Sequence, residues 1–253
     1  MTDRKEEMEV ITKKIHILGI CGSPRKGNSE FLLNEALHAA SGVNPDWVET
    51  TVYSVRGKKF SPCVACFKCS NDNHLGECVF HDDFQELRER WIDSDVIIYS
   101  VPVYHLHIPG QLKCFLDRLG NTIHKYFKVP SVRFLKVVGA IAQGSHFSAG
   151  QESAVNFLIQ HAVLRNCIPV SGDGWQSYLG ACGWTLCQTE EDALEKQFER
   201  KEFNAELVVN ASRSLGRRAV ELSLILRYGG VRLKELFEKD PCYGPFLKRL
   251  PRE

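Results

Sequence analysis

The chain has 253 residues, and its 32 lysines and arginines nearly balance 31 aspartates and glutamates, so the formal net charge of +1 indicates neither a nucleic-acid footprint nor a strongly anionic partner. No run approaches ~20 apolar residues and the charged N-terminus lacks the apolar core of a signal peptide, so we expect a cytoplasmic protein that does not span a membrane. In that compartment the ten cysteines are expected to be metal ligands or buried thiols.

Short apolar runs alternate with helical patterns along the chain. Strands are predicted at residues 15–20, 47–54, 95–101 and 134–142, with a weaker fifth strand at residues 167–170. Helices are predicted to begin near Ser29, near Asp82 or Asp83, at Gly110 and at Gln151. This alternation is typical of a three-layer, doubly wound α/β domain with a five-stranded parallel sheet.

The C-terminal part has a different pattern. Residues 171–188 are rich in glycine and aromatic residues without a clear period, and we expect an ordered loop there. A long helix is predicted over residues 190–226, with a break near Gly216, and the tail that follows has no assigned structure. We therefore divide the chain into a core domain at residues 1–189 and a C-terminal helical extension at residues 190–253. The extension is expected to pack on the core or on a neighbouring subunit.

Four cysteines fall within the predicted loop at residues 61–83, namely Cys63, Cys66, Cys69 and Cys78. A loop can wrap around one compact metal centre and direct these thiols inward. Structural zinc usually takes two Cys-x2-Cys pairs, whereas three cysteines at x2 steps plus a fourth is the local form of iron–sulfur ligation. A zinc site and a metal-free group of thiols remain alternatives at this point.

The turn between the first strand and the first helix has the composition of an anion site. It contains Ser23, Arg25, Asn28 and Ser29. Free backbone N–H groups and the positive end of a helix favour an anion such as a terminal phosphate here. The turn is neither a Walker A sequence nor a GxGxxG fingerprint. The alternative is a polar turn that caps the helix.

Two further loops follow the third and fourth strands, where open α/β sheets bind ligands. Their candidate residues are Pro102, Val103, Tyr104 and His105 in the first loop, and Gly144, Ser145 and His146 in the second. Aromatic and imidazole groups in the first loop could pack against a planar ring. Glycine in the second loop permits close backbone approach, and its serine and histidine can hydrogen-bond ring atoms. No residue is assigned a catalytic role.

Four segments together resemble the flavodoxin-like NADPH-dependent FMN reductase family. They are Gly22–Arg25, Ser100–Tyr104, Gln111–Arg118 and Gly150–Glu152. The resemblance implies a flavodoxin-like fold in which the first loop holds the FMN phosphate, Pro102–Tyr104 line the isoalloxazine, and Gly144–His146 approach its pyrimidine side.

The cysteines, followed by Asp82 and Asp83, resemble the iron–sulfur flavoprotein branch of that family. This resemblance implies an FMN-dependent electron-transfer oxidoreductase with a 4Fe–4S cluster that passes single electrons to or from FMN. The implied partners are NAD(P)H, ferredoxin or a quinone, and the implied assembly is a homodimer or homotetramer. One alternative is a cluster-free NAD(P)H-dependent reductase of quinones, flavins or nitroaromatics. The other is a zinc-stabilised, non-enzymatic interaction module.

Overall fold

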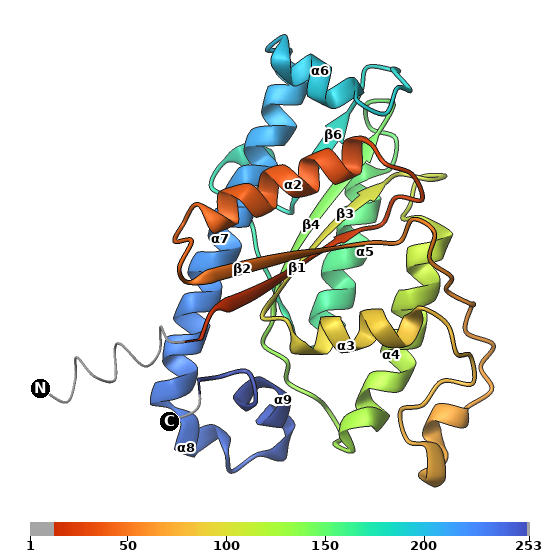
Figure 1. Ribbon diagram of the computed structural model, residues 1–253, viewed down its shortest axis with the longest axis vertical. Coiled ribbons are helices and arrows are strands. Elements are labelled where there is room, and N and C mark those ends of the chain that lie inside the picture. Colours follow the sequence, from red (N-terminus) through yellow and green to blue (C-terminus); the bar gives the residue numbers. More distant parts are fainter. Residues whose placement is uncertain (1–12, 252–253) are drawn as a thin grey trace, which may run out of the picture.

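A six-stranded sheet forms the centre of the computed structural model, which describes residues 13–251. The strands are β1 (Ile15–Cys21), β2 (Val48–Ser54), β3 (Val96–Pro102), β4 (Val137–Gly144), β5 (Ile168–Pro169) and β6 (Ala181–Trp184). All paired strands are parallel, in the order β2-β1-β3-β4-β5, and β6 also pairs with β4 (Figure 1). The predicted doubly wound α/β sheet is confirmed.

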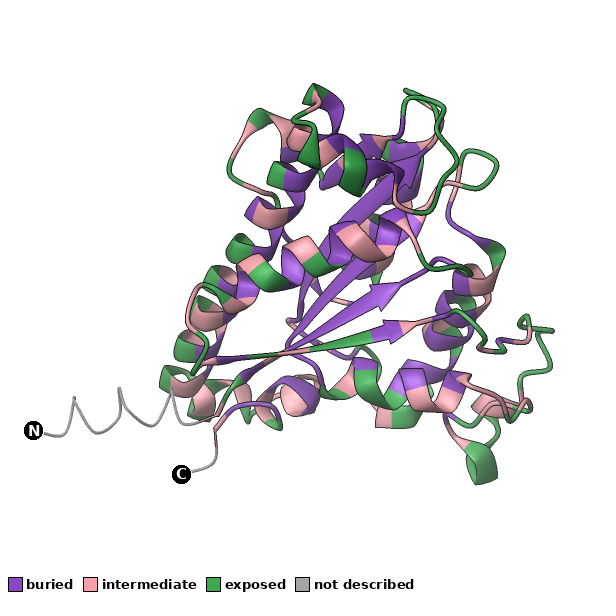
Figure 2. Cartoon of the chain, turned by 45° about the horizontal axis from the view of Figure 1, so that its top comes forward, coloured by how far each residue is buried: buried purple, intermediate pink, exposed green. Residues whose placement is uncertain are grey.

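Helices cover both faces of the sheet. One layer contains α2 (Asn28–Ser41) and α7 (Phe203–Arg232), and the other contains α3 (Phe84–Asp93), α4 (Gly110–Phe127) and α5 (Gln151–Leu164) (Figure 1). Shorter helices are α6 (Ala193–Glu199), α8 (Lys234–Phe237) and α9 (Gly244–Leu247). The central strands β1, β3 and β4 are buried along most of their length, as parallel strands covered on both sides must be, whereas the edge strand β2 is partly exposed (Figure 2). Among residues 13–251, no helix combines the length and the hydropathy of a membrane-spanning segment.

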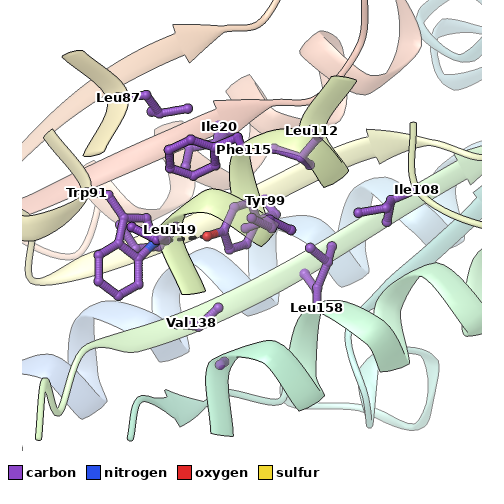
Figure 3. Packing of buried hydrophobic residues seen from close by; sticks show 14 of the residues in the cluster. Ile20, Leu87, Trp91, Tyr99, Ile108, Leu112, Phe115, Leu119, Val138 and Leu158 are labelled. Atoms are coloured by element: carbon purple, nitrogen blue, oxygen red, sulfur yellow. Dashed lines mark hydrogen bonds between the residues drawn. The ribbon is translucent and has the colours of Figure 1, made fainter. Parts of the chain in front are cut away.

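The core on the α3–α5 side is rich in aromatic residues. Trp91 donates its indole N–H to the hydroxyl of Tyr99 at 2.9 Å, which satisfies both polar groups inside the apolar layer (Figure 3). Phe115 lies in the same cluster and packs against Phe84. Phe84, Trp91 and Phe115 are all buried, so α3 and α4 direct apolar faces at the sheet.

The fifth position of the sheet differs from the predicted single strand at residues 167–170. β5 pairs only with the start of β4, at Val137 and Val138, whereas β6 pairs with its end, from Ile141 to Gly144. Part of the segment at residues 171–188, predicted as a loop, is therefore a strand. Its sequence, Ala-Cys-Gly-Trp, is too short and too poor in β-branched residues to indicate a strand.

The predicted break near Gly216 is wrong, because α7 continues through this residue. The interruption lies instead at residues 200–202, between α6 and α7, where Lys201 has a φ of 58°. Gly216 serves helix packing: a Cβ built on it would overlap the carbonyl oxygen of Ala36 in α2. The glycine allows these two helices to lie in close contact.

A buried carboxylate joins the sheet to the C-terminal segments. Asp95 accepts hydrogen bonds from the His16 backbone N–H at 3.0 Å, from Arg227 of α7 at 2.9 Å and from Arg249 at 3.3 Å. Both arginines are buried. Because a buried charge is costly without partners, this triad fixes α7 and the segment after α9 against the sheet.

Gly216→Ala should lower the free energy of unfolding by about 1–3 kcal/mol, because the added methyl group overpacks the contact between α2 and α7. The matched control is Gly229→Ala in the same helix, where an added Cβ has no described heavy atom within 4 Å. This control should be neutral or stabilising, since alanine favours a helix more than glycine does. Urea unfolding measures both variants, and equal stability of the two would contradict the packing role.

Candidate functional site

The turn between β1 and α2 places polar groups at the carboxyl edge of the sheet. The Ser23 hydroxyl donates to the Arg25 carbonyl at 2.7 Å and accepts from the Arg25 N–H at 3.3 Å, so it closes the turn. Gly27 has a φ of 151°, and a Cβ on it would lie 3.0 Å from the Glu191 carbonyl oxygen. Ser29 lies in the first turn of α2, which has no side-chain cap, and the Glu30 N–H donates to the Gly27 carbonyl at 2.9 Å.

Two of the predicted phosphate ligands contact the segment before α6. Asn28 donates to the Glu190 carbonyl at 3.2 Å and accepts from the Leu194 N–H at 2.8 Å, so its amide connects α2 to α6. Arg25 is exposed and donates to the Thr189 carbonyl at 3.4 Å. The structure thus gives Asn28 a bracing role that the sequence does not predict, while the Arg25 side chain remains accessible to an anion.

The loop after β3 forms a tight turn. The backbones of Tyr104 and His107 exchange two hydrogen bonds, at 2.8 and 3.1 Å, and His105 and Leu106 have positive φ. Pro102 and Val103 lead into this turn, and the Val103 N–H donates to the Gln143 carbonyl at 2.8 Å. This bond joins the β3 loop to the β4 loop, so the two predicted ring-binding loops lie side by side.

The loop after β4 is shaped by side chains from elsewhere in the sequence. Gln151, the first residue of α5, donates to the His146 carbonyl at 2.7 Å and accepts from the Ala149 N–H at 2.7 Å. Cys187 donates its backbone N–H to the Ser145 carbonyl at 2.8 Å, and its sulfur lies 3.0 Å from Nδ1 of His146. The sequence analysis missed Cys187, because only the fold brings the two loops together.

The four predicted cysteine ligands line a single pocket of about 260 Å³. The cysteine loop, residues 61–83, forms one wall, and α4 forms the other with Arg118, Asn121 and Thr122. Asn121 donates to the Cys63 sulfur at 3.4 Å and accepts from the Cys69 thiol at 3.7 Å. The fold therefore gathers thiols that are up to fifteen positions apart against one face of a helix.

Arg118 holds the cysteine loop to α4. It is 1% exposed, and one of its Nη atoms contacts both carboxylate oxygens of Asp82, at 2.7 and 2.8 Å. It also donates to the carbonyls of Phe80 and Ser61 and, through Nε, to the Cys78 sulfur at 3.2 Å. Burial raises the pKa of the Asp82 carboxyl, but hydrogen bonds from Ser61 and Arg118 outweigh it and hold that pKa below its usual value.

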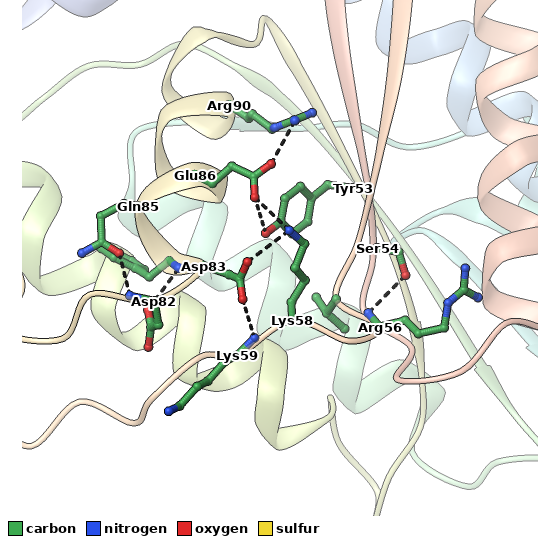
Figure 4. Close-up of polar contacts among 12 residues, drawn as sticks. Tyr53, Ser54, Arg56, Lys58, Lys59, Asp82, Asp83, Gln85, Glu86 and Arg90 are labelled. Carbon is green, nitrogen blue, oxygen red and sulfur yellow. Dashed lines mark hydrogen bonds and ion pairs between the residues drawn. The ribbon is translucent and has the colours of Figure 1, made fainter.

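A second ionic group closes the base of the cysteine loop. Lys58 contacts Asp83 at 3.1 Å and Glu86 at 2.9 Å, and the Lys59 N–H donates to Asp83 at 2.7 Å (Figure 4). These side chains are partly exposed, so water screens their attraction and each pair contributes little to stability. Their geometry nevertheless brings the strand end and the start of α3 together.

The donor set of the cysteine pocket is four thiols. Structural zinc sites and iron–sulfur clusters both use four cysteine ligands. Among residues 13–251, no three His, Cys, Asp or Glu side chains are grouped as a ready-made site for one metal ion. The residues that line the pocket therefore fit either centre by their chemistry.

A second pocket, which we call the aromatic pocket, lies beside the β4 loop. Its volume is about 620 Å³, and its apolar lining includes Leu106, Phe147, Trp175, Tyr178 and Trp184. The Phe147 and Trp184 rings are 5.1 Å apart in an edge-on arrangement. Trp175 and Tyr178 are 67% and 72% exposed, so water reaches broad aromatic faces at the mouth.

Comparisons with known proteins agree with this geometry. Residues 15–176 match the family model of NADPH-dependent FMN reductases. An iron–sulfur flavoprotein of Archaeoglobus fulgidus is 36% identical over 182 residues, which cover 70% of this chain and 87% of that protein. One from Methanocaldococcus jannaschii is 32% identical over 192 residues, 74% of this chain and 93% of that protein. RosB, solved with a riboflavin-phosphate intermediate, has a TM-score of 0.60 at 14% identity and 89% and 88% coverage, a likeness of fold.

Asp82→Ala should lower the free energy of unfolding by about 3–5 kcal/mol, because it leaves the Arg118 charge buried without its carboxylate. The matched control is Asp117→Ala, which breaks the exposed pair between Lys113 and Asp117 on the same helix. This change should cost less than about 1 kcal/mol. Chemical unfolding of both variants provides the measurement, and similar losses would show that the buried pair does not anchor the loop.

Proposed function

The chain belongs to the NADPH-dependent FMN reductase family and is a flavin-dependent oxidoreductase, and from this premise we propose that it transfers single electrons between FMN and a 4Fe–4S cluster. The observation that carries the proposal is the pocket lined by Cys63, Cys66, Cys69 and Cys78. The names of the related iron–sulfur flavoproteins support the same assignment.

FMN is proposed to lie across the three loops at the carboxyl edge. Its phosphate would accept from the N–H groups of Asn28 and Ser29 at the start of α2, from the Ser29 hydroxyl and from Arg25. Ser23 would join them by turning its hydroxyl away from the Arg25 carbonyl. Asn28 would act mainly by bracing this turn. The ring would lie between the segments Pro102–His105 and Gly144–His146, which the Val103–Gln143 hydrogen bond holds together. When bound, FMN supplies both one-electron and two-electron chemistry.

Helix α4 connects the two proposed centres. It begins at Gly110, immediately after the β3 loop, and presents Arg118 to the cysteine pocket. The step of eight positions from Gly110 to Arg118 corresponds to a rise of about 12 Å along the helix axis. One rigid element therefore positions the flavin loop and the thiols relative to each other, which supports electron transfer within one chain.

Anaerobically purified protein should show flavin absorption bands together with a broad iron–sulfur shoulder that bleaches on reduction. Chemical analysis should find roughly four iron atoms and four sulfides per chain, because four thiolates bind a 4Fe–4S cluster. Changing Cys63 and Cys66 to serine should remove the iron and retain FMN. Flavin bands without iron in the native protein would contradict the cluster, and a colourless zinc protein would contradict both cofactors.

The aromatic pocket favours a second candidate function, the NAD(P)H-dependent reduction of planar acceptors such as quinones, flavins or nitroaromatics. Exposed aromatic faces bind flat rings by stacking, and each such contact contributes about 0.5–1.5 kcal/mol. The pocket shares Leu106 with the β3 loop and Phe147 with the β4 loop. An acceptor bound there would lie next to the proposed flavin ring.

For this second function, Trp175→Ala should raise the KM for a quinone by roughly three- to tenfold, with kcat little changed, because one stacking face is lost. The matched control is Phe203→Ala, since Phe203 is equally exposed at 70% but does not line the pocket. Steady-state kinetics with NADPH measure both variants. An unchanged KM would argue against acceptor binding at Trp175, and light scattering would reveal whether the variant alters self-association instead.

A further inference from the structure

We infer that Arg118 is a positioning residue for the proposed cluster: its Nε–H group donates to the Cys78 sulfur, fixes the fourth ligand and raises the reduction potential of the cluster. This inference rests on the proposed function, because it assumes that the cysteine pocket holds a cluster. It goes beyond that proposal by assigning a role to a residue that binds neither iron nor flavin.

The guanidinium of Arg118 has no freedom to turn away from Cys78. Both Nη atoms are engaged, with Asp82 and the Ser61 carbonyl on one and the Phe80 carbonyl on the other. The ring of Phe84 packs 4.2 Å from the guanidinium carbon. With the planar fork fixed in this way, the remaining donor, Nε–H, points at the Cys78 sulfur at 3.2 Å.

This hydrogen bond holds Cys78, the proposed ligand that is most distant from the other three along the sequence. Cys63, Cys66 and Cys69 follow one another at three-residue steps, whereas Cys78 comes nine positions after Cys69. Cys69 lies in a short 3-10 turn at 68–70, a second one follows at 72–74, and the chain from there to Cys78 is largely exposed. Arg118 compensates for this separation by bonding to Cys78, Phe80 and Asp82 from one buried side chain.

The sign of the effect on potential follows from electrostatics. Reduction adds negative charge to a cluster, and N–H groups that donate to its sulfurs stabilise that charge. Because Asp82 lies against the guanidinium at 2.7 Å, the Arg118–Asp82 pair has no net charge. The stabilisation therefore comes mainly from the directed Nε–H bond. Asn121 adds a second donor from the same helix face, at 3.4 Å from the Cys63 sulfur.

The test is a redox titration of the reconstituted full chain, followed by electron paramagnetic resonance for the cluster and by absorbance for FMN. Arg118→Gln should shift the cluster to a more negative potential and accelerate iron loss, with the FMN potentials unchanged. Arg118→Lys, which retains the charge but loses the fork, should show an intermediate shift. Lys113→Gln, an exposed change on the same helix, should leave the cluster potential unchanged.

Asp82→Asn distinguishes a directed hydrogen bond from simple loosening of the loop. It removes the compensating charge but leaves the Nε–H donor, so the cluster potential should rise, opposite to the shift in Arg118→Gln. If both changes shift the potential in the same direction, or if the Arg118 variants keep the native potential and full iron content, the inference is overturned. If the native protein contains no iron, the proposed function fails instead.

If Arg118→Gln does not fold, the inference can be tested by measuring cysteine alkylation in the cluster-free protein. Arg118→Lys should increase the rate at which iodoacetamide alkylates Cys78, measured by peptide mass spectrometry, because the guanidinium no longer shields the sulfur or holds it in place. Alkylation of Cys66, which does not contact Arg118 in the described hydrogen bonds, provides the internal reference. Equal rates at Cys78 in the native and Arg118→Lys proteins would contradict the positioning role.

Discussion

A buried guanidinium must be surrounded by acceptors, and this requirement organises the candidate site. Arg118 lies inside the apolar layer between α3 and α4, where an unpaired charge would cost several kcal/mol. The acceptors come from Ser61, Phe80 and Asp82, which lie at the two ends of the cysteine loop. The loop therefore cannot move off α4 without leaving that charge unpaired. The positions of the thiols therefore follow from the need to supply hydrogen-bond acceptors for the Arg118 guanidinium.

The layered fold could be predicted from the sequence because its signals are local. Apolar runs located the first four strands within about three residues, and helical spacing located α2 to α5. The predictions failed where long-range contacts decide the structure. Glycine often breaks a helix, but Gly216 lies inside α7, where it allows close contact with Ala36. The real interruption at residues 200–202 contains neither glycine nor proline. β6 forms because β4 offers it unpaired backbone groups beyond β5.

The candidate site, like the fold, was predictable where the signal is local and unpredictable where long-range contacts decide the structure. Residue types and spacing indicated the four cysteines and the three loops. The fold brings the three loops to the carboxyl edge of the sheet and the cysteines against α4, a helix that their spacing did not indicate. The partners of individual side chains could not be predicted. Asn28 has the chemistry of a phosphate ligand, yet its amide binds the chain at Glu190 and Leu194, more than 160 positions away. Likewise, nothing near His146 in the sequence indicates that Cys187 lies 3.0 Å from its ring.

The division of the fifth sheet position between β5 and β6 has a consequence for aggregation. A long exposed edge strand is a template for pairing with another chain, and proteins blunt such edges with short strands, bulges and proline. Here the edge consists of strands of two and four residues, and Pro169 lacks an N–H group to donate. Extension of the sheet into a second molecule is therefore disfavoured at this edge. Contacts there would have to use the aromatic side chains of the loop between the two strands.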